Sequence, residues 1–300
     1  MQANDPIMSG SYAVGVDIGG THITAAIVDL QAGAVVEGTL ERSLVNAQGT
    51  TEEVLESWYH PMERVISRWP APLRYLGVAL PGPFDYEGGV ALIRGMHKYD
   101  SIFGEDVKQF LARKLSLERD NIQMRNDTEA FLEGEVIAGA AKGACTAIAV
   151  TLGTGLGTAR SLNGFAEDLN LGSSDFREGI AEDYLSTRWF VERYRELSGK
   201  EVSGVAELVK LGREDALLQQ LFAEFAKNLA LFLQGFIRFE KPDVVIIGGN
   251  ISRAHDLFFP QLHRLLEAGP VKIYTPGLWE KAALIGAVSC WIKDCRAQAG

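Results

Sequence analysis

The chain has 300 residues, 47% of them hydrophobic and 23% charged, a composition typical of a globular protein with a large core. Its 29 basic and 39 acidic residues give a net charge of −10. This charge argues against nucleic acid or an anionic membrane as a partner. At about 100–200 residues per domain, the length predicts two domains. The three cysteines form no CxxC pair, which is typical of a reducing, cytoplasmic compartment.

The first half of the chain alternates apolar strands, turns and helices. Residues 1–11 lack the basic and apolar segments of a signal peptide and are predicted to be a flexible tail. After them, periodicity and turn residues predict strands at 12–18, 23–30, 34–40 and 76–80, and helices at 50–68 and 105–115. The turn Gly19-Gly20-Thr21 separates the first two strands, and Pro81-Gly82-Pro83 follows the last one.

The second half repeats the pattern of strand, glycine turn and strand. Strands are expected at 148–152, 158–162 and 244–247, and helices at 183–197, 215–239 and 282–292. The uncharged stretch 143–159 is rich in glycine and threonine, so we interpret it as a strand and a turn rather than a membrane span. The repeat predicts two similar α/β lobes that face each other across a cleft.

The first glycine turn suits a phosphate group. Glycine lets the backbone approach an anion closely, and the N–H groups with the Thr21 hydroxyl can then donate to it. Asp17 could orient a hydrated Mg2+. The alternative is a plain hairpin turn in which Asp17 bonds the local backbone.

Two further glycine turns follow strands. The turn at 153–157 reads GTGLG, which is neither a Walker loop nor the GxGxxG dinucleotide fingerprint. The other is Gly248-Gly249-Asn250, at the end of a Val/Ile strand, where open α/β sheets place ligands. Three such turns together predict phosphate binding. The other glycines, out of 32, are expected to be ordinary turn punctuation.

The sequence at 14–21, VGVDIGGT, resembles the first phosphate motif of the ROK sugar kinases, in the sugar kinase, actin and Hsp70 superfamily. Pro81-Gly82-Pro83, NDTEA at 126–130 and the two later turns follow in the family's order. The resemblance implies an α/β fold of two ribonuclease-H-like, actin-like ATPase lobes around an interdomain cleft. The N-terminal lobe would span 12–125, joined by the C-terminal helix 282–300, and the C-terminal lobe 126–281.

The resemblance also implies ATP-dependent phosphorylation of a hexose, at the 6-hydroxyl of glucose or an N-acetylhexosamine, by a homodimer. Asp127 matches the general base, and Asn126 and Gly82 match sugar contacts. Without the family, Asp127 reads more simply as a helix N-cap. Asp17 would hold Mg2+ through water. The residues assigned to ATP are Gly19, Gly20, Thr21, His22, Gly153, Thr154, Gly155, Gly248, Gly249 and Asn250.

The sugar side departs from the family pattern. No His or Cys lies between Gly157 and Leu185, so the family's structural zinc is not expected. Asn170 and Ser173 stand where the family has a sugar-binding Glu and His. Glu182 matches a later Glu ligand, although it could simply be an acid in a helix's first turn. His97 matches an Asn ligand, with an exposed loop histidine as the alternative.

His22 stands where the family usually has a Lys or Asn, and could still face the phosphates. Because the sugar contacts are altered, a non-catalytic sugar- or nucleotide-binding regulator of the same family is the alternative function. A DNA-binding helix-turn-helix is not expected, since only eleven residues precede the first strand. An oxidoreductase would need the dinucleotide fingerprint that is missing.

Overall fold

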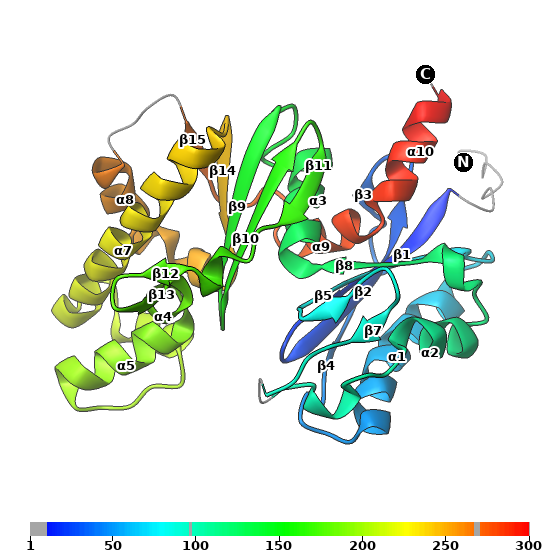
Figure 1. The fold of residues 1–300 in the computed structure, drawn as a ribbon, viewed down its shortest axis with the longest axis horizontal. Helices are drawn as coiled ribbons and strands as arrows, with labels where there is room; N and C mark the ends of the chain where they lie inside the picture. The colour runs from blue at the N-terminus through cyan, green and yellow to red at the C-terminus, as the bar shows by residue number, and fades with distance from the viewer. Residues whose placement is uncertain (1–10, 96–97, 267–270, 300) are drawn as a thin grey trace. The chain divides into compact units, whose positions relative to one another are not determined.

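The computed structural model describes residues 11–95, 98–266 and 271–299 (Figure 1). The chain divides into two compact units. In the described residues, unit 1 comprises 11–139 and 278–299, and unit 2 comprises 140–266 and 271–277. Apart from Ser11, the tail expected at 1–11 lies outside the described residues.

Unit 1 is built on a sheet in the order β3-β2-β1-β5-β8, with β4 also paired to β2. Strands β1 to β3 are antiparallel neighbours, whereas β1, β5 and β8 run parallel. The strands are β1 (Tyr12–Ile18), β2 (His22–Asp29), β3 (Ala34–Val35), β4 (Glu41–Leu44), β5 (Tyr75–Leu80) and β8 (Ile122–Asn126).

Unit 2 has the same strand order and the same directions, β11-β10-β9-β14-β15. Here β9 to β11 are antiparallel neighbours, and β9, β14 and β15 run parallel. The strands are β9 (Thr146–Leu152), β10 (Leu156–Leu162), β11 (Phe165–Asp168), β14 (Val244–Gly248) and β15 (Lys272–Tyr274). The predicted repeat of two α/β lobes is thus confirmed at the level of strand order.

Helices cover both faces of the unit 1 sheet. On one face α1 buries Val54, Trp58 and Met62, and its capping box of Thr50 and Glu53 fixes its start. On the other face α9 lies against β1 and β5. The helices are α1 (Thr51–Arg68), α2 (Val107–Leu115), α3 (Asp127–Ala138), α9 (Glu280–Ala287) and α10 (Ser289–Ala299), and a small hairpin consists of β6 (Phe84–Asp85) and β7 (Val90–Ala91).

Glycines let α3, α9 and the sheet touch through their backbones. A Cβ on Gly134 would overlap the carbonyl of Ala282, and one on Gly286 would overlap the carbonyl of Ala130. Gly15 and Gly77, within β1 and β5, make the same approach to α9. The expectation that glycines outside the three turns are ordinary punctuation is therefore wrong for these positions.

The same contact explains where the units divide. The sequence placed the boundaries after Arg125 and after Lys281, whereas the structure places them after Gly139 and after Gly277. Helix α3 stays with unit 1 because α9 packs on it. The buried Glu135 carboxylate adds a bond, since its Oε1 accepts from the Leu278 N–H at 2.8 Å. The bond ties α3 to the segment that leads into α9.

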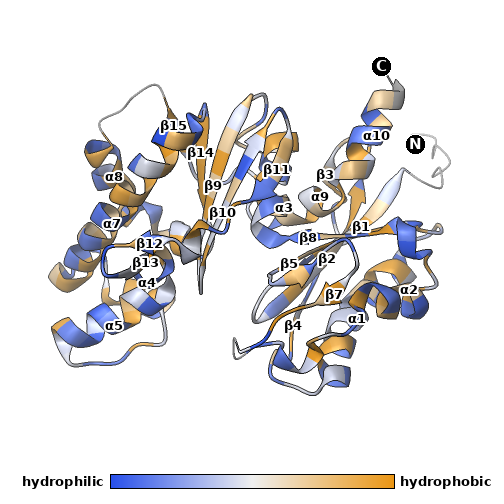
Figure 2. Cartoon of the chain, in the orientation of Figure 1, coloured by the Kyte–Doolittle hydropathy of each residue, from blue (hydrophilic) through white to orange (hydrophobic). Residues whose placement is uncertain are grey.

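Unit 2 packs its helices through aromatic side chains. Phe190, Phe222, Phe225 and Phe258 are fully buried beside β9 and β14. The long α7 carries hydrophobic and hydrophilic residues along its length (Figure 2). The helices are α4 (Ala181–Leu185), α5 (Thr187–Ser198), α6 (Val205–Leu208), α7 (Ala216–Glu240) and α8 (Phe259–Leu265), and β12 (Asp175–Phe176) pairs with β13 (Gly179–Ile180). No helix in the described ranges combines the length and apolarity needed to span a bilayer.

Three expected elements are broken in the structure. The strand expected at 34–40 stops at Val35, because Gly38 turns the chain with φ of 77°; β4, which periodicity missed, follows it. The helix expected at 183–197 is interrupted by the extended backbone of Ser186. The helix expected at 282–292 is two helices, since Val288 leaves helical geometry.

Candidate phosphate and sugar site

The polar residues of unit 1 meet at one edge of its sheet. In the parallel register, Asp17 of β1 pairs with Ala79 of β5, and Leu80 pairs with Asn126 of β8. The strands therefore deliver Asp17, the Pro81–Pro83 loop and the Asn126-Asp127 pair to the same carboxyl edge. This is where open α/β sheets bind ligands.

Asp17 lies in an electrostatically unfavourable place for a carboxylate. Burial and the neighbouring Asp127 raise the pKa of Asp17 to about 7, against the opposing effect of Arg42. Arg42 sits in the same cross-strand row, since Asp17 pairs with Thr24 and Thr24 with Arg42. Within the described part of the chain no hydrogen bond holds the Asp17 carboxylate, so the local backbone bond considered for it does not form.

Paired carboxylates are a donor set that suits Mg2+. Among the residues that the structure describes, no group of three or more His, Cys, Asp or Glu side chains could hold a metal. Mg2+ held at Asp17 through water would therefore take its direct ligands from water and phosphate. When bound, it would neutralise phosphate charge.

A buried tyrosine anchors the first glycine turn. The Gly19 N–H donates to the His22 carbonyl at 2.8 Å, and the Tyr99 hydroxyl donates to the Gly19 carbonyl at 2.5 Å. Burial raises the pKa of Tyr99 to about 12, which keeps this donor protonated. Gly20 and Thr21 stay exposed, while Thr21 Oγ1 bonds His22 Nδ1 at 2.9 Å.

The sequence did not indicate a role for Tyr99, although His97, two residues earlier, was expected to contact the sugar. Full burial of its side chain and its left-handed backbone, with φ of 62°, have no signal in the sequence pattern. His97 itself lies outside the described residues.

Asn126 fixes the start of α3 and leaves Asp127 as its first residue. Asn126 Oδ1 accepts from the N–H groups of Thr128 at 2.8 Å and Glu129 at 3.1 Å. The capping role considered for Asp127 therefore belongs to Asn126. Asp127 sits at the positive end of the helix dipole, which favours a carboxylate there.

The two glycine turns of unit 2 are neighbours at the end of its parallel strands. Gly248 pairs with Thr151, two residues before the first of the two turns. Gly249 has φ of 84°, and a Cβ there would overlap the Leu152 backbone, so only glycine fits. The strands thus bring Gly153, Thr154, Gly155, Gly248, Gly249 and Asn250 to one edge.

The turn at 153–157 is held from α5. The Thr187 N–H and Oγ1 donate to the Gly153 carbonyl at 2.8 and 2.9 Å, and the Gly153 N–H donates to Gly155 at 3.0 Å. Thr154 remains exposed. The turn is thereby fixed with part of its backbone open to an anion.

Glu182 reaches the same turn. It lies in the first turn of α4, as the simpler interpretation has it. Its Oε2 also accepts from the Leu156 N–H at 3.0 Å, and a Cβ on Gly155 would lie 2.6 Å from that oxygen. The absence of a side chain at Gly155 therefore makes room for the carboxylate.

Asn170 and Ser173 lie in a short turn that also packs on Leu156. Ser173 Oγ donates to Asn170 Oδ1 at 3.4 Å across a short 3-10 turn. Gly172 in that turn packs on the Leu156 carbonyl. The structure thus brings Asn170, Ser173 and Glu182 together around the start of β10.

The duplicated five-strand order with glycine turns at its carboxyl edges belongs to the actin-like ATPase fold. A family model described as "ROK family" matches residues 13–168 and 177–294. The chain belongs to the ROK family.

Known relatives agree with this assignment. A glucokinase of Thermotoga maritima is 26% identical over 203 residues, which cover 55% of this chain and 64% of that protein. The chain thus spans less than two thirds of that relative. The inorganic polyphosphate/ATP-glucomannokinase of Arthrobacter sp. strain KM is 25% identical, with a TM-score of 0.72 and coverage of 95% of this chain and 99% of that one. A ROK family glucokinase from Streptomyces griseus, solved with glucose and AMPPNP, has a TM-score of 0.73 at 21% identity, with coverage of 93% and 98%.

Proposed function

We propose that the protein is an ATP-dependent sugar kinase that phosphorylates the 6-hydroxyl of a hexose, either glucose or an N-acetylhexosamine. The observation that carries the proposal is the placement of Asp127. It is the first residue of α3, beside an Asn126 cap, at the sheet edge that also presents Asp17. Family membership and the glucokinase relative support the reaction class.

Asp127 is the general base in this proposal. The sugar hydroxyl attacks the γ-phosphorus of ATP, its proton passes to the Asp127 carboxylate, and the bond from the γ-phosphorus to the β,γ-bridging oxygen breaks to release ADP. A positioned base contributes about 10²–10⁴-fold to such a step. The remaining acceleration comes from alignment and charge neutralisation.

The glycine turns bind the nucleotide in this proposal. Exposed Gly20 and Thr21 in unit 1 and the fixed turn at Gly153–Gly155 in unit 2 offer N–H and hydroxyl donors to phosphate oxygens. His22 is held at Thr21 and would add a ring N–H. Asp17 would hold Mg2+ through water.

Each unit presents candidate sugar contacts of its own. Asn126 and the Gly82 loop stand at the unit 1 edge, and Glu182, Asn170 and Ser173 surround Leu156 in unit 2. Asn170 and Ser173 carry no charge, so Glu182 is the only one of these three that can accept hydroxyl protons as an anion.

Purified protein with Mg-ATP should phosphorylate at least one sugar of a broad panel of hexoses and N-acetylhexosamines. The release of ADP measures the reaction. Asp127→Asn should lower kcat by about 10²–10⁴-fold while the Tm stays within a few degrees. The amide has the same shape as the carboxylate, so the start of α3 should stay intact. Glu118→Gln is the matched control, because it makes the same change of carboxylate to amide at an exposed position. No turnover of any sugar by the wild type would contradict the proposal.

A sugar- or nucleotide-binding regulator is the second candidate. The hydrogen bond between Asn170 and Ser173 favours this function, because each side chain then has one fewer polar group to offer a sugar. Neither side chain carries a charge. Calorimetry separates the two. Binding of sugar and AMPPNP without turnover of sugar and ATP would favour the regulator.

A further inference from the structure

The Asn126 carboxamide has only one end available for a ligand. Its Oδ1 already accepts from two N–H groups of α3. Its Nδ2 carries two hydrogens, and one of them points to the Tyr86 hydroxyl at 3.4 Å. Asn126 is buried, with 9% of its surface exposed, so it has little freedom to turn over.

Tyr86 contacts the ends of β5 and β8 and the Gly82 loop at the unit 1 edge. Its hydroxyl donates to the Leu80 carbonyl, the last residue of β5, at 3.2 Å. It accepts from Asn126, the last residue of β8. A Cβ on Gly82 would lie 3.1 Å from the same hydroxyl. The ring of Tyr86 packs beside Phe84 with centroids 5.5 Å apart.

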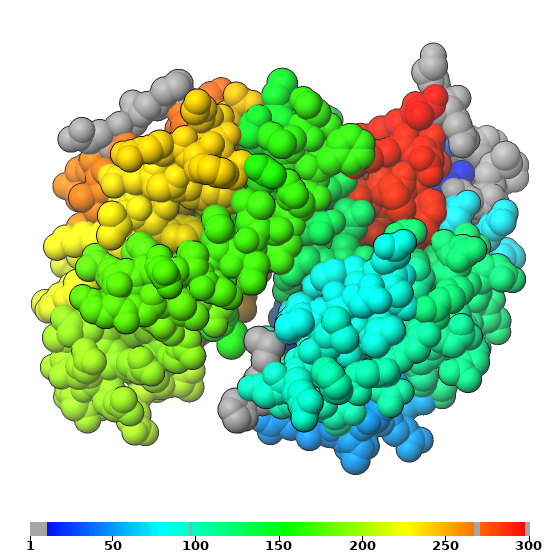
Figure 3. Space-filling model, viewed as in Figure 1, coloured from blue at the N-terminus to red at the C-terminus, as the bar shows by residue number. Residues whose placement is uncertain are grey.

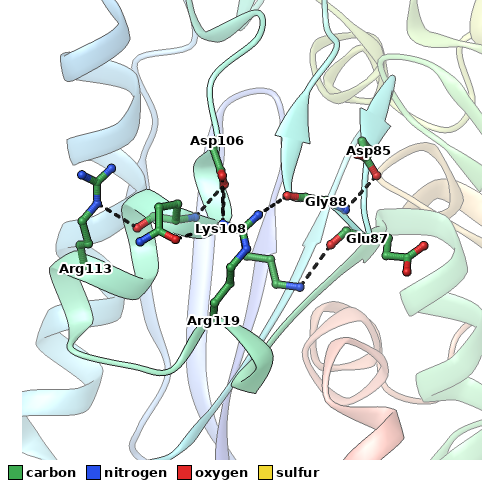
Figure 4. Close-up of polar contacts among 8 residues, drawn as sticks. Asp85, Glu87, Gly88, Asp106, Lys108, Arg113 and Arg119 are labelled. Carbon is green, nitrogen blue, oxygen red and sulfur yellow. Dashed lines mark hydrogen bonds and ion pairs between the residues drawn. The ribbon is translucent and has the colours of Figure 1, made fainter.

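The hairpin that carries Tyr86 is held from outside the site. It lies on the surface of the molecule, cyan in Figure 3. Arg119 donates to the Gly88 carbonyl at 2.5 Å and to both oxygens of Asp106 at 2.8 and 3.0 Å (Figure 4). The buried Lys108 donates to the Glu87 carbonyl at 3.3 Å, and its stem packs on Gly89.

These contacts give the hairpin a fixed position relative to α2 and β8. The Asp85 Oδ1 accepts from the Gly88 N–H at 2.9 Å and closes the turn itself. A hairpin of two short strands is not stable alone. The Arg119 and Lys108 bonds therefore supply the rigidity that a precisely placed hydroxyl needs.

We propose that Tyr86 is a positioning residue of the sugar site that holds the Asn126 amide with its N–H toward the substrate. The inference rests on the proposed kinase function and deepens it. Asn126 then acts only as a donor, so the sugar hydroxyl that it contacts must be an acceptor. A hydroxyl that accepts from Asn126 keeps its own proton free for Asp127.

The experiment is a double-mutant cycle of Tyr86→Phe and Asn126→Ser. Tyr86→Phe removes the hydroxyl and keeps the ring. Asn126→Ser keeps a side chain that caps helices well but is too short to offer the amide N–H. Tyr59→Phe is the matched control, because it removes a hydroxyl that bonds Glu63 at 2.6 Å on the outer side of α1.

Tyr86→Phe should lower kcat/KM for the sugar by about 3- to 10-fold, the value of one hydrogen bond, and leave the KM for ATP unchanged. Calorimetry without nucleotide should show the same loss in sugar affinity. In the Asn126→Ser background the further loss on adding Tyr86→Phe should shrink to less than about 2-fold, because the shared contact is already gone. Tyr59→Phe should match the wild type.

Each other outcome overturns the inference in a distinguishable way. If the wild type turns over sugar and Tyr86→Phe is kinetically identical to it, or the two effects multiply independently, Tyr86 does not act through Asn126. If Tyr86→Phe loses ATP and sugar affinity equally, in step with Tm, its role is only structural. If the wild type neither binds nor phosphorylates sugar, the proposed function fails and this inference fails with it.

Discussion

Asp17 in unit 1 and Thr151 in unit 2 stand at the same place in the repeated sheet. Each lies two residues before a glycine turn and pairs with the neighbouring parallel strand, Asp17 with Ala79 and Thr151 with Gly248. The unit 1 edge gathers carboxylates, whereas the unit 2 edge gathers glycine backbones. A duplicated framework thus carries two chemistries, one suited to protons and cations and the other to anions.

The packing behind the two edges differs as well. In unit 1, α9 meets α3 and the sheet through glycines, so backbones fix the distances. In unit 2, α5, α7 and the residue that precedes α8, Phe258, meet through phenylalanine rings. Side chains can adjust by rotation, whereas a backbone contact cannot. We therefore expect losses in unit 2 to affect stability and losses in unit 1 to affect catalysis too.

The largest effect is expected from Phe225→Ala in unit 2. Phe225 is fully buried, with its ring 4.8 Å from that of Phe190 and 5.4 Å from that of Phe258. Its truncation should cost about 3–5 kcal/mol in the free energy of unfolding, measured by urea denaturation. Phe239→Ala, at a side chain 81% exposed, is the control and should cost less than about 0.5 kcal/mol. Equal losses would show that the aromatic cluster does not hold unit 2.

Gly286→Ala should break the backbone contact in unit 1. The added Cβ must push α9 away from Ala130, which should cost about 1–3 kcal/mol and also lower kcat, because α3 carries Asp127. Gly235→Ala in α7 is the matched control, since nothing lies within 4 Å of its added Cβ. That control should gain about 0.5–1 kcal/mol. An unchanged kcat in Gly286→Ala would argue against a link between this contact and Asp127.

Asp17→Asn tests the charge on the unit 1 edge. The raised pKa of Asp17 means that the folded protein holds the proton more tightly than the unfolded chain does. Protonation of Asp17 therefore stabilises the fold; the effect is fully present below pH 4 and is lost as the pH rises through about 7. Without Mg2+, the variant should be more stable than the wild type at pH 8 by on the order of 1–2 kcal/mol. The difference should shrink at pH 5. A stability difference that does not change with pH would contradict this account. In a kinase assay the variant should have little activity.

The smallest effect compares helix caps in the two units. Asp215 caps α7 by accepting from Leu217 and Leu218, much as Asn126 caps α3. Asp215→Ala and Asn126→Ala should each cost about 1 kcal/mol in stability. Only Asn126→Ala should also lose sugar turnover. Matching kinetics in the two variants would remove Asn126 from the sugar site.

Local patterns in the sequence predicted most of the framework. Apolar runs ending in glycine located β1, β9 and β14, and the spacing of Val54, Trp58 and Met62 located α1. The first of these runs pointed to Asp17, whereas Asp127 was assigned only through the resemblance of NDTEA at 126–130 to the ROK family. Short strands such as β4 were missed because four residues of mixed polarity carry no periodic signal.

Contacts between distant segments could not be predicted. Gly286 and Ala130 are far apart in the chain, so nothing near either residue indicates the backbone approach that holds α3 in unit 1. Tyr86 and Tyr99 likewise act through hydroxyl bonds to Asn126 and Gly19, which arise only when the strands assemble. Whether Asn126 or Asp127 caps α3 depends on which of the two has non-helical backbone, and the sequence does not determine this.

The seating of α3 on α9 has a consequence for biosynthesis. Unit 2 is one continuous stretch of chain, but unit 1 needs residues from both sides of it. During translation, unit 2 can fold as soon as it emerges from the ribosome, whereas α3 must wait for α9. Once the chain has emerged from the ribosome as far as residue 277, it would therefore display a folded unit 2 and an unsupported α3. In the proposed function, the nascent chain would stay inactive until α9 has emerged.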